Sequence, residues 1–109
     1  MANVYKVLGQ VGDASANDVS LYAVPSSTEA VISTIVICNR EAAANTFRIA
    51  VKPDNATLAD SHYLAFDSSI GANDTITLTL GITLGDTDVV SVGASDANVT
   101  FSAFGSEIS

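Results

Sequence analysis

The sequence has few of the residues on which several large classes of protein depend. Its 109 residues include no tryptophan, one cysteine, one histidine and two prolines. Four Lys and Arg residues stand against twelve Asp and Glu residues, which gives a formal net charge of −8 at pH 7. Nucleic-acid-binding proteins neutralise phosphates with clustered cations, so this shortage of basic residues argues against a nucleic-acid partner.

The shortage of reactive side chains limits the chemistry. A lone Cys38 forms no intramolecular disulfide and no thiolate cluster for zinc, and it ends an apolar stretch where a small core residue is expected. His62 is interpreted as a strand-entry or surface residue. A nucleophile activated by His62 is the alternative, but the sequence lacks the Gly-x-Ser-x-Gly pattern. We predict a protein that is not an enzyme and that holds no cofactor and no metal.

Long hydrophobic runs are also missing. The longest, at residues 31–38, is interrupted by Ser33 and Thr34 and is far shorter than the ~20 residues that span a bilayer. Residues 1–10 show no basic region followed by an apolar region, as a secretory signal would. We expect no membrane association, and synthesis in a reducing cytoplasm.

What the sequence does contain is a two-residue alternation of apolar and polar side chains. Residues 73–84 show it most clearly and predict one strand with an aliphatic face turned inward, formed by Ile76, Leu78, Leu80, Ile82 and Leu84. Shorter alternating runs occupy residues 47–52, 90–93 and 99–103. Residues 30–38 are apolar on both parities, which is typical of a central strand that is covered on both faces, or of one that is covered on one face by a partner.

Groups of Pro, Gly, Asn, Asp and Ser separate these runs at the spacing of an all-β domain. We predict an all-β, two-sheet antiparallel β-sandwich of about eight strands, with jelly-roll or immunoglobulin-like connections that alternation does not distinguish. Residues 1–109 form one domain, with residues 1–12 and 104–109 as extended terminal contact segments.

Most of the acidic residues fall in the turn groups, where Asp closes turns by accepting backbone hydrogen bonds. A calcium site using Asp86 and Asp88 is the alternative, although no EF-hand spacing is present. The negative charge is therefore expected at the ends of the sandwich, and the strand faces are expected to be nearly neutral.

Two groups of residues are candidates for contacts with other proteins. The terminal segments contribute apolar side chains, and a basic group stands out on an acidic body, where it can serve as a docking point or as an ordinary solvated strand face. Arg48 and Lys52 share a parity and are expected on one face of their strand. The seven candidates are Tyr5, Val7, Arg40, Arg48, Lys52, Phe104 and Ile108.

Four stretches together resemble a known family. They are LYAVP at residues 21–25, AVISTIVICNR at residues 30–40, NDT at residues 73–75 and LGDTDVVSV at residues 84–92. Their order and spacing are similar to those of small β-sandwich virion proteins of tailed bacteriophages, including phages of marine bacteria and cyanobacteria. The similarity extends from about Leu21 to Phe104.

This resemblance implies a virion structural protein that decorates or cements a capsid, or serves as a tail or neck accessory. Its partners would be other virion proteins and further copies of itself, and it would be assembled in the cytoplasm of the bacterial host. The resemblance carries over no catalytic or binding residues. The alternative is a carbohydrate- or receptor-binding module of a tail or fibre, in which Tyr22 and Tyr63 would be the candidates for stacking on a sugar.

Overall fold

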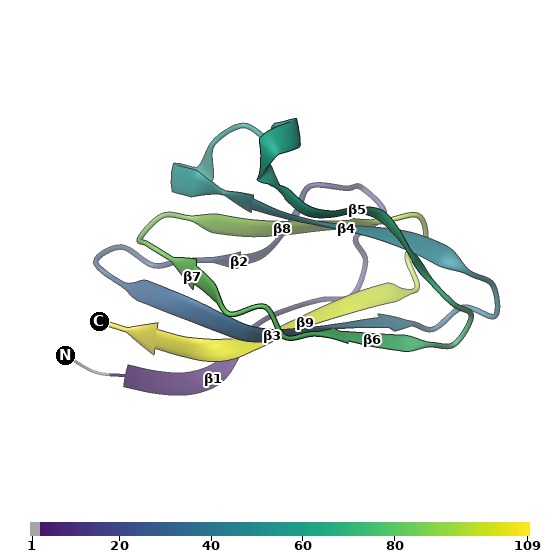
Figure 1. The fold of residues 1–109 in the computed structure, drawn as a ribbon, viewed down its shortest axis with the longest axis horizontal. Coiled ribbons are helices and arrows are strands. Elements are labelled where there is room, and N and C mark those ends of the chain that lie inside the picture. The colour runs from purple at the N-terminus through teal and green to yellow at the C-terminus, as the bar shows by residue number, and fades with distance from the viewer. Residues whose placement is uncertain (1–2) are drawn as a thin grey trace.

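The computed structural model describes residues 3–109, which form two antiparallel β-sheets packed face to face (Figure 1). The five-stranded sheet has the order β1-β9-β3-β6, with β7 also paired to β3, and the four-stranded sheet has the order β2-β8-β4-β5. Two short 3-10 turns, Pro53–Asn55 and Asp60–His62, connect β4 to β5. The strands are β1 Asn3–Val11, β2 Val19–Ala23, β3 Glu29–Asn39, β4 Asn45–Lys52, β5 Tyr63–Ile70, β6 Thr75–Leu78, β7 Ile82–Leu84, β8 Val89–Ala94 and β9 Val99–Ile108.

The strand order is that of a jelly roll. The chain pairs as one long hairpin, in which β1 pairs with β9, β2 with β8, β3 with β6 and β7, and β4 with β5. Rolling this hairpin places successive pairs alternately in the two sheets, and the pairings of β3 with β9 and of β4 with β8 complete them. The structure therefore confirms the predicted two-sheet β-sandwich and selects jelly-roll over immunoglobulin-like connections.

The core lies between the sheets and consists of the inward-facing aliphatic side chains predicted from alternation. Phe101 is 1 % exposed and packs edge-on against Phe47 from the opposite sheet, with ring centroids 6.5 Å apart. Burial of these groups is the main stabilising contribution. Fully buried aliphatic residues around the two rings include Ile32, Ile35, Ile37, Ile49, Ile70, Val90, Val92 and Val99.

The single strand predicted at residues 73–84 is wrong. The structure has β6 and β7 there, separated at Gly81, whose φ of 64° ends the extended conformation. Ile35 is opposite Leu78 and Ile32 is opposite Ile82, so β3 spans fewer residues across this gap than the segment facing it. Leu80 therefore lies in the break and is 48 % exposed, against the prediction that it belongs to the buried face of a strand.

Alternation at residues 90–93 predicted one buried and one solvent-exposed face for β8, but both of its faces are buried. The inward side chains face the core, and the outward ones lie beneath the connection between β1 and β2. A Cβ atom added to Gly93 would lie 2.3 Å from Oδ1 of Asn17, so the absence of a side chain allows this close approach. Within residues 3–109, no helix is long and apolar enough to cross a membrane.

We expect Gly93→Ala to lower the free energy of unfolding by about 1–3 kcal/mol, the usual cost of overpacking a buried site. The added methyl group displaces Asn17 and the loop that covers β8. Chemical denaturation of the two proteins measures the difference. Gly12→Ala is the matched control, because a Cβ atom at Gly12 meets nothing within 4 Å.

Candidate docking surface

The side chains of the five-stranded sheet that point away from the core form a surface that we call the outer face. Strand register defines it, because residues alternate between the two faces of a strand. Tyr5 is opposite Ser106, which is opposite Val31, while Val7 is opposite Phe104. The apolar members of the outer face are Tyr5, Val7, Val31, Val36, Phe104 and Ile108.

These apolar side chains are not covered by the rest of the chain. Tyr5 is 80 % exposed and Val7 is 50 % exposed. Val31, Val36 and Phe104 are half-buried by their neighbours within the sheet. Exposed apolar side chains that gather on one face of a domain are typical of a protein-interaction surface.

In the four-stranded sheet, by contrast, central side chains that point away from the core are buried. In the four-stranded sheet, Ala50 and Ser91 also point away from the core, yet they are only 2 % and 1 % exposed. The connection between β1 and β2 passes beside this sheet (Figure 1), and there the backbone N–H of Ala94 donates a hydrogen bond to the carbonyl of Ala14. The centre of the four-stranded sheet is thus covered by the chain's own loop, whereas the outer face of the five-stranded sheet is left open.

Four of the seven residues predicted to make contacts come together on the outer face. Tyr5 and Val7 on β1 lie beside Phe104 and Ile108 on β9, although they come from opposite ends of the sequence. The predicted terminal segments 1–12 and 104–109 are therefore largely paired strands, and Met1 and Ala2 lie outside the described residues.

The three basic candidates do not join them. Arg48 and Lys52 point outward from β4 in the other sheet, as their parity predicted, and Arg40 is exposed in the connection from β3 to β4. The expectation of a solvated strand face is wrong for Lys52, which is only 9 % exposed. Its Nζ donates a hydrogen bond to Oδ1 of Asp18 at 2.8 Å, so the ammonium group is neutralised by the loop that covers the sheet.

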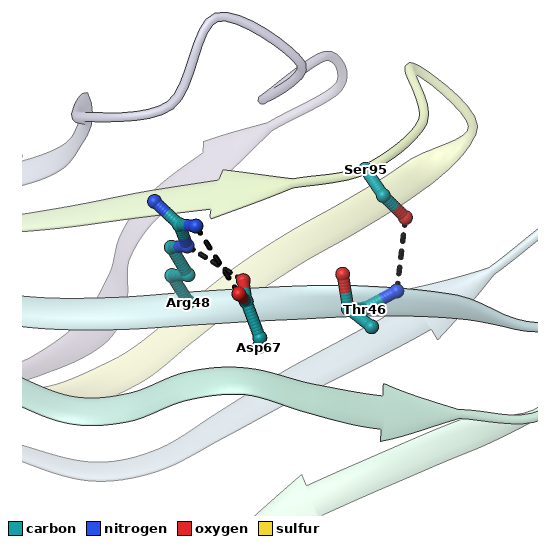
Figure 2. A network of polar contacts seen from close by, with 4 residues as sticks. All are labelled: Thr46, Arg48, Asp67 and Ser95. Carbon is teal, nitrogen blue, oxygen red and sulfur yellow. Dashed lines mark hydrogen bonds and ion pairs between the residues drawn. The ribbon is translucent and has the colours of Figure 1, made fainter.

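Arg48 is also engaged within the chain (Figure 2). Its Nε and one terminal nitrogen donate hydrogen bonds to the two carboxylate oxygens of Asp67 on β5, at 2.7 and 3.2 Å. These hydrogen bonds lower the pKa of Asp67. The guanidinium carbon also lies 4.2 Å from the ring centroid of Phe66. Near the start of β4, the backbone N–H of Thr46 donates a hydrogen bond to Oγ of Ser95 (Figure 2).

A polar cluster that sequence reasoning missed ties both termini to the second sheet. The hydroxyl of Tyr22 on β2 donates a hydrogen bond to Oε2 of Glu107 on β9, while Nζ of Lys6 on β1 lies 2.9 Å from Oε1. The hydrogen bond from Tyr22, followed by that from Lys6, lowers the pKa of Glu107. Desolvation and the adjacent carboxylate raise the pKa of Tyr22.

This cluster predicts an acid-sensitive contribution to stability. Because the pKa of Glu107 is lower in the folded chain, its carboxylate stabilises the fold fully above the unfolded pKa of about 4.3. That contribution is lost as the pH falls through the lower folded value. We expect Glu107→Gln to have a lower Tm than the wild type at pH 7, and the difference to shrink below about pH 4. A pH-independent difference measured by calorimetry would contradict this assignment.

A groove of about 600 Å³ opens between the edges of the two sheets. One wall is β5 and the other is formed by β6 and β7, and the lining includes Phe47, Leu64, Leu78 and Leu80. Leu64 and Leu80 are 51 % and 48 % exposed. Alternation did not reveal this groove, because it assigned Leu80 to the core.

The residues considered for catalysis and metal binding are dispersed. Cys38 is half-buried on β3, whereas His62 precedes β5 of the opposite sheet, where its Nδ1 accepts a hydrogen bond from the N–H of Ala59. Asp88 accepts hydrogen bonds from the backbone N–H groups of Asp54 and Gly85, both at 2.9 Å, which confirms the turn interpretation of that carboxylate. Within residues 3–109, no three His, Cys, Asp or Glu side chains form a group that could hold a metal ion.

Comparisons with known proteins add little to this geometry. No protein-family model and no curated protein matches the sequence. One similar chain occurs in the cryo-EM structure of the virus-like particle of the extra small virus of the giant freshwater prawn, Macrobrachium rosenbergii. It is 11 % identical, with 98 % of this chain and 79 % of that chain covered and a TM-score of 0.31. At this TM-score the similarity carries no argument, and the jelly-roll assignment depends on the strand order alone.

Proposed function

We propose that the chain is a non-enzymatic structural protein of a tailed-phage virion, which decorates or cements the capsid or serves as a tail or neck accessory. It binds other virion proteins through the outer face. One observation carries this proposal: apolar side chains of the outer face lie open, while the chain's own loop covers the centre of the four-stranded sheet. The resemblance of residues 21–104 to small virion proteins supports the biological setting.

The charge distribution suits such a role. The body carries a net charge of −8, whereas the strands of the outer face direct Ser, Thr and apolar side chains outward, with Glu29 at one end. A protein partner can therefore approach the outer face without desolvating a layer of carboxylates. Aromatic anchors contribute most to protein interfaces, and Tyr5 and Phe104 are such anchors.

Binding to particles tests the proposal. Purified particles should contain the chain, as detected by mass spectrometry, and particles made without it should take up the purified wild-type protein. We expect Phe104→Asp and Val36→Asp to weaken this uptake at least about 30-fold, because a charge buried in an interface costs about 2 kcal/mol or more. Circular dichroism and thermal unfolding confirm that each variant is folded.

Leu64→Asp is the matched control. Leu64 is 51 % exposed on β5, outside the outer face, and we expect its substitution to leave uptake unchanged. Purified particles without the chain would contradict the virion assignment. Equal uptake of the wild type and both outer-face variants would contradict the role of the outer face.

Glycan binding is the second candidate, and the position of one ring favours it. Phe66 is 55 % exposed on β5, edge-on to Tyr63 at 4.8 Å between centroids, and Asp60 shares the same shallow hollow. An aromatic face beside a carboxylate is suited to a sugar ring and its hydroxyl groups. Tyr22, the other sequence candidate, is 7 % exposed and is unavailable for stacking. A glycan array probed with the wild type and Phe66→Ala separates this function from a purely structural one.

A further inference from the structure

The edge strands of the sandwich, β1, β2, β5, β6 and β7, differ in how well they are protected against pairing with another chain. β6 and β7 have only four and three residues, and β2 has five residues with a register shift. β5 has two register shifts and carries Asp67 in a left-handed conformation. Short edges, bulges and charges are the devices by which natural sheets prevent further pairing.

β1 lacks this protection over its first five described residues. It has nine residues, and its register shift lies beyond them, between Val7 and Gly9. Its single charged side chain, Lys6, is neutralised by Glu107 of the same chain. Val4, Tyr5 and Val7 are 50 %, 80 % and 50 % exposed. β9 occupies one edge of β1, and within residues 3–109 no strand occupies the other.

We propose that the free edge of β1 pairs antiparallel with β1 of a second copy of this chain, across a two-fold axis near Tyr5. Such an axis makes the interface isologous, so the assembly closes as a dimer and does not grow into a filament. Pairing centred on Tyr5 places Lys6 of one copy opposite Val4 of the other, which keeps the two ammonium groups apart. The two five-stranded sheets become one continuous sheet.

Residues 3–7 are self-complementary in this register, because no like charges meet, and this favours a second copy as the occupant of the edge. Two bodies of charge −8 repel each other wherever their acidic turns meet, and β1 contains no Asp or Glu. Pairing through β1 keeps the acidic turns apart while backbone hydrogen bonds form. It also places Tyr5 of each copy opposite Tyr5 of the other, with Val7 opposite Asn3, so the two outer faces become one continuous surface.

The dimer is expected to be in equilibrium with monomer. The molecule extends 45 by 27 Å along its two longer axes, and a strand pair covers only a small part of its surface. The dimer therefore buries less than the roughly 800 Å² per partner of a standard interface. Sedimentation velocity from low micromolar to millimolar concentration should therefore show monomer converting to dimer. A wild type that remains monomeric throughout this range would overturn the proposal.

Tyr5→Asp tests the location of the interface. Because Tyr5 is 80 % exposed, the substitution leaves the core intact, but it places two carboxylates at the two-fold axis. We expect loss of the dimer with unchanged thermal unfolding. Thr83→Asp is the matched control, since Thr83 is exposed on the same face at the far edge of the sheet and should leave dimerisation unchanged. A dimer that survives Tyr5→Asp would exclude β1.

Amide exchange locates the interface without substitutions. We expect the exchange of backbone amides in residues 3–7 to slow as the protein concentration rises, because pairing protects the edge of β1. Slowing in β5 and β6 instead would place the contact at the groove and overturn the proposal. The proposed function is tested separately: Val36→Asp, two strands away from β1, should lose particle uptake and keep the dimer.

Discussion

Replacing Phe101 with alanine is expected to lower the free energy of unfolding by about 3–5 kcal/mol. The ring is 1 % exposed on β9, the strand that pairs with both β1 and β3. It also packs edge-on against Phe47 of the opposite sheet. Its removal therefore leaves a cavity at the centre of the sandwich and takes away an aromatic contact between the two sheets.

Denaturant unfolding of Phe101→Ala and the wild type measures this difference. Phe66→Ala is the matched control, because it removes the same side chain from a position that is 55 % exposed. Its expected cost is about 1 kcal/mol or less, most of it from the contact with Arg48. Equal costs for the two substitutions would contradict the assignment of Phe101 to the core.

The second large effect is expected at Asn39, the last residue of β3, which is 1 % exposed. Its Nδ2 donates hydrogen bonds to the carbonyls of Ala43 and Gly71, at 2.9 and 3.0 Å. Its Oδ1 accepts from the N–H of Glu41 and from Nδ2 of Asn45, both at 3.1 Å. One side chain thus holds two connections together at this end of the sandwich.

We expect Asn39→Ala to lower the free energy of unfolding by about 3 kcal/mol or more, because it leaves several buried polar groups without partners. Asn39→Asp should cost at least as much in spite of its equal size, since a carboxylate directs its charge at the two carbonyls that the amide satisfied. Chemical denaturation measures both differences.

Asn3→Ala is the matched control for Asn39→Ala, because it removes the same side chain from an exposed site at the start of β1. It should stay within about 0.5 kcal/mol of the wild type, as is usual for surface substitutions. An Asn39→Ala protein as stable as this control would contradict the network.

Local alternation predicted those parts of the fold in which each strand has one buried face. Val99, Phe101 and Ala103 are buried as their period-two pattern indicates. The pattern failed at residues 79–81, because alternation continues through a break that is set by the pairing of β6 and β7 with β3. It also failed at β8, where a distant loop covers the face that alternation assigned to solvent.

The sequence predicted several residues of the candidate surface but not their arrangement. The apolar composition of the terminal segments identified Tyr5, Val7, Phe104 and Ile108, but their arrangement as one patch depends on the pairing of β1 with β9. Lys52 was named for its charge, and its burial beside Asp18 follows from the path of the loop that carries Asp18. Such long-range contacts leave no local pattern in the sequence.

A cryo-EM map of particles that carry the chain tests the central claim most directly. The predicted result is that the sheet β1-β9-β3-β6 faces a neighbouring protein, with Phe104 and Val36 in the contact. The four-stranded sheet, whose centre is covered by the chain's own loop, faces solvent or makes a smaller contact. A map in which the outer face is fully exposed to solvent, while another side of the chain contacts the particle, would contradict the account.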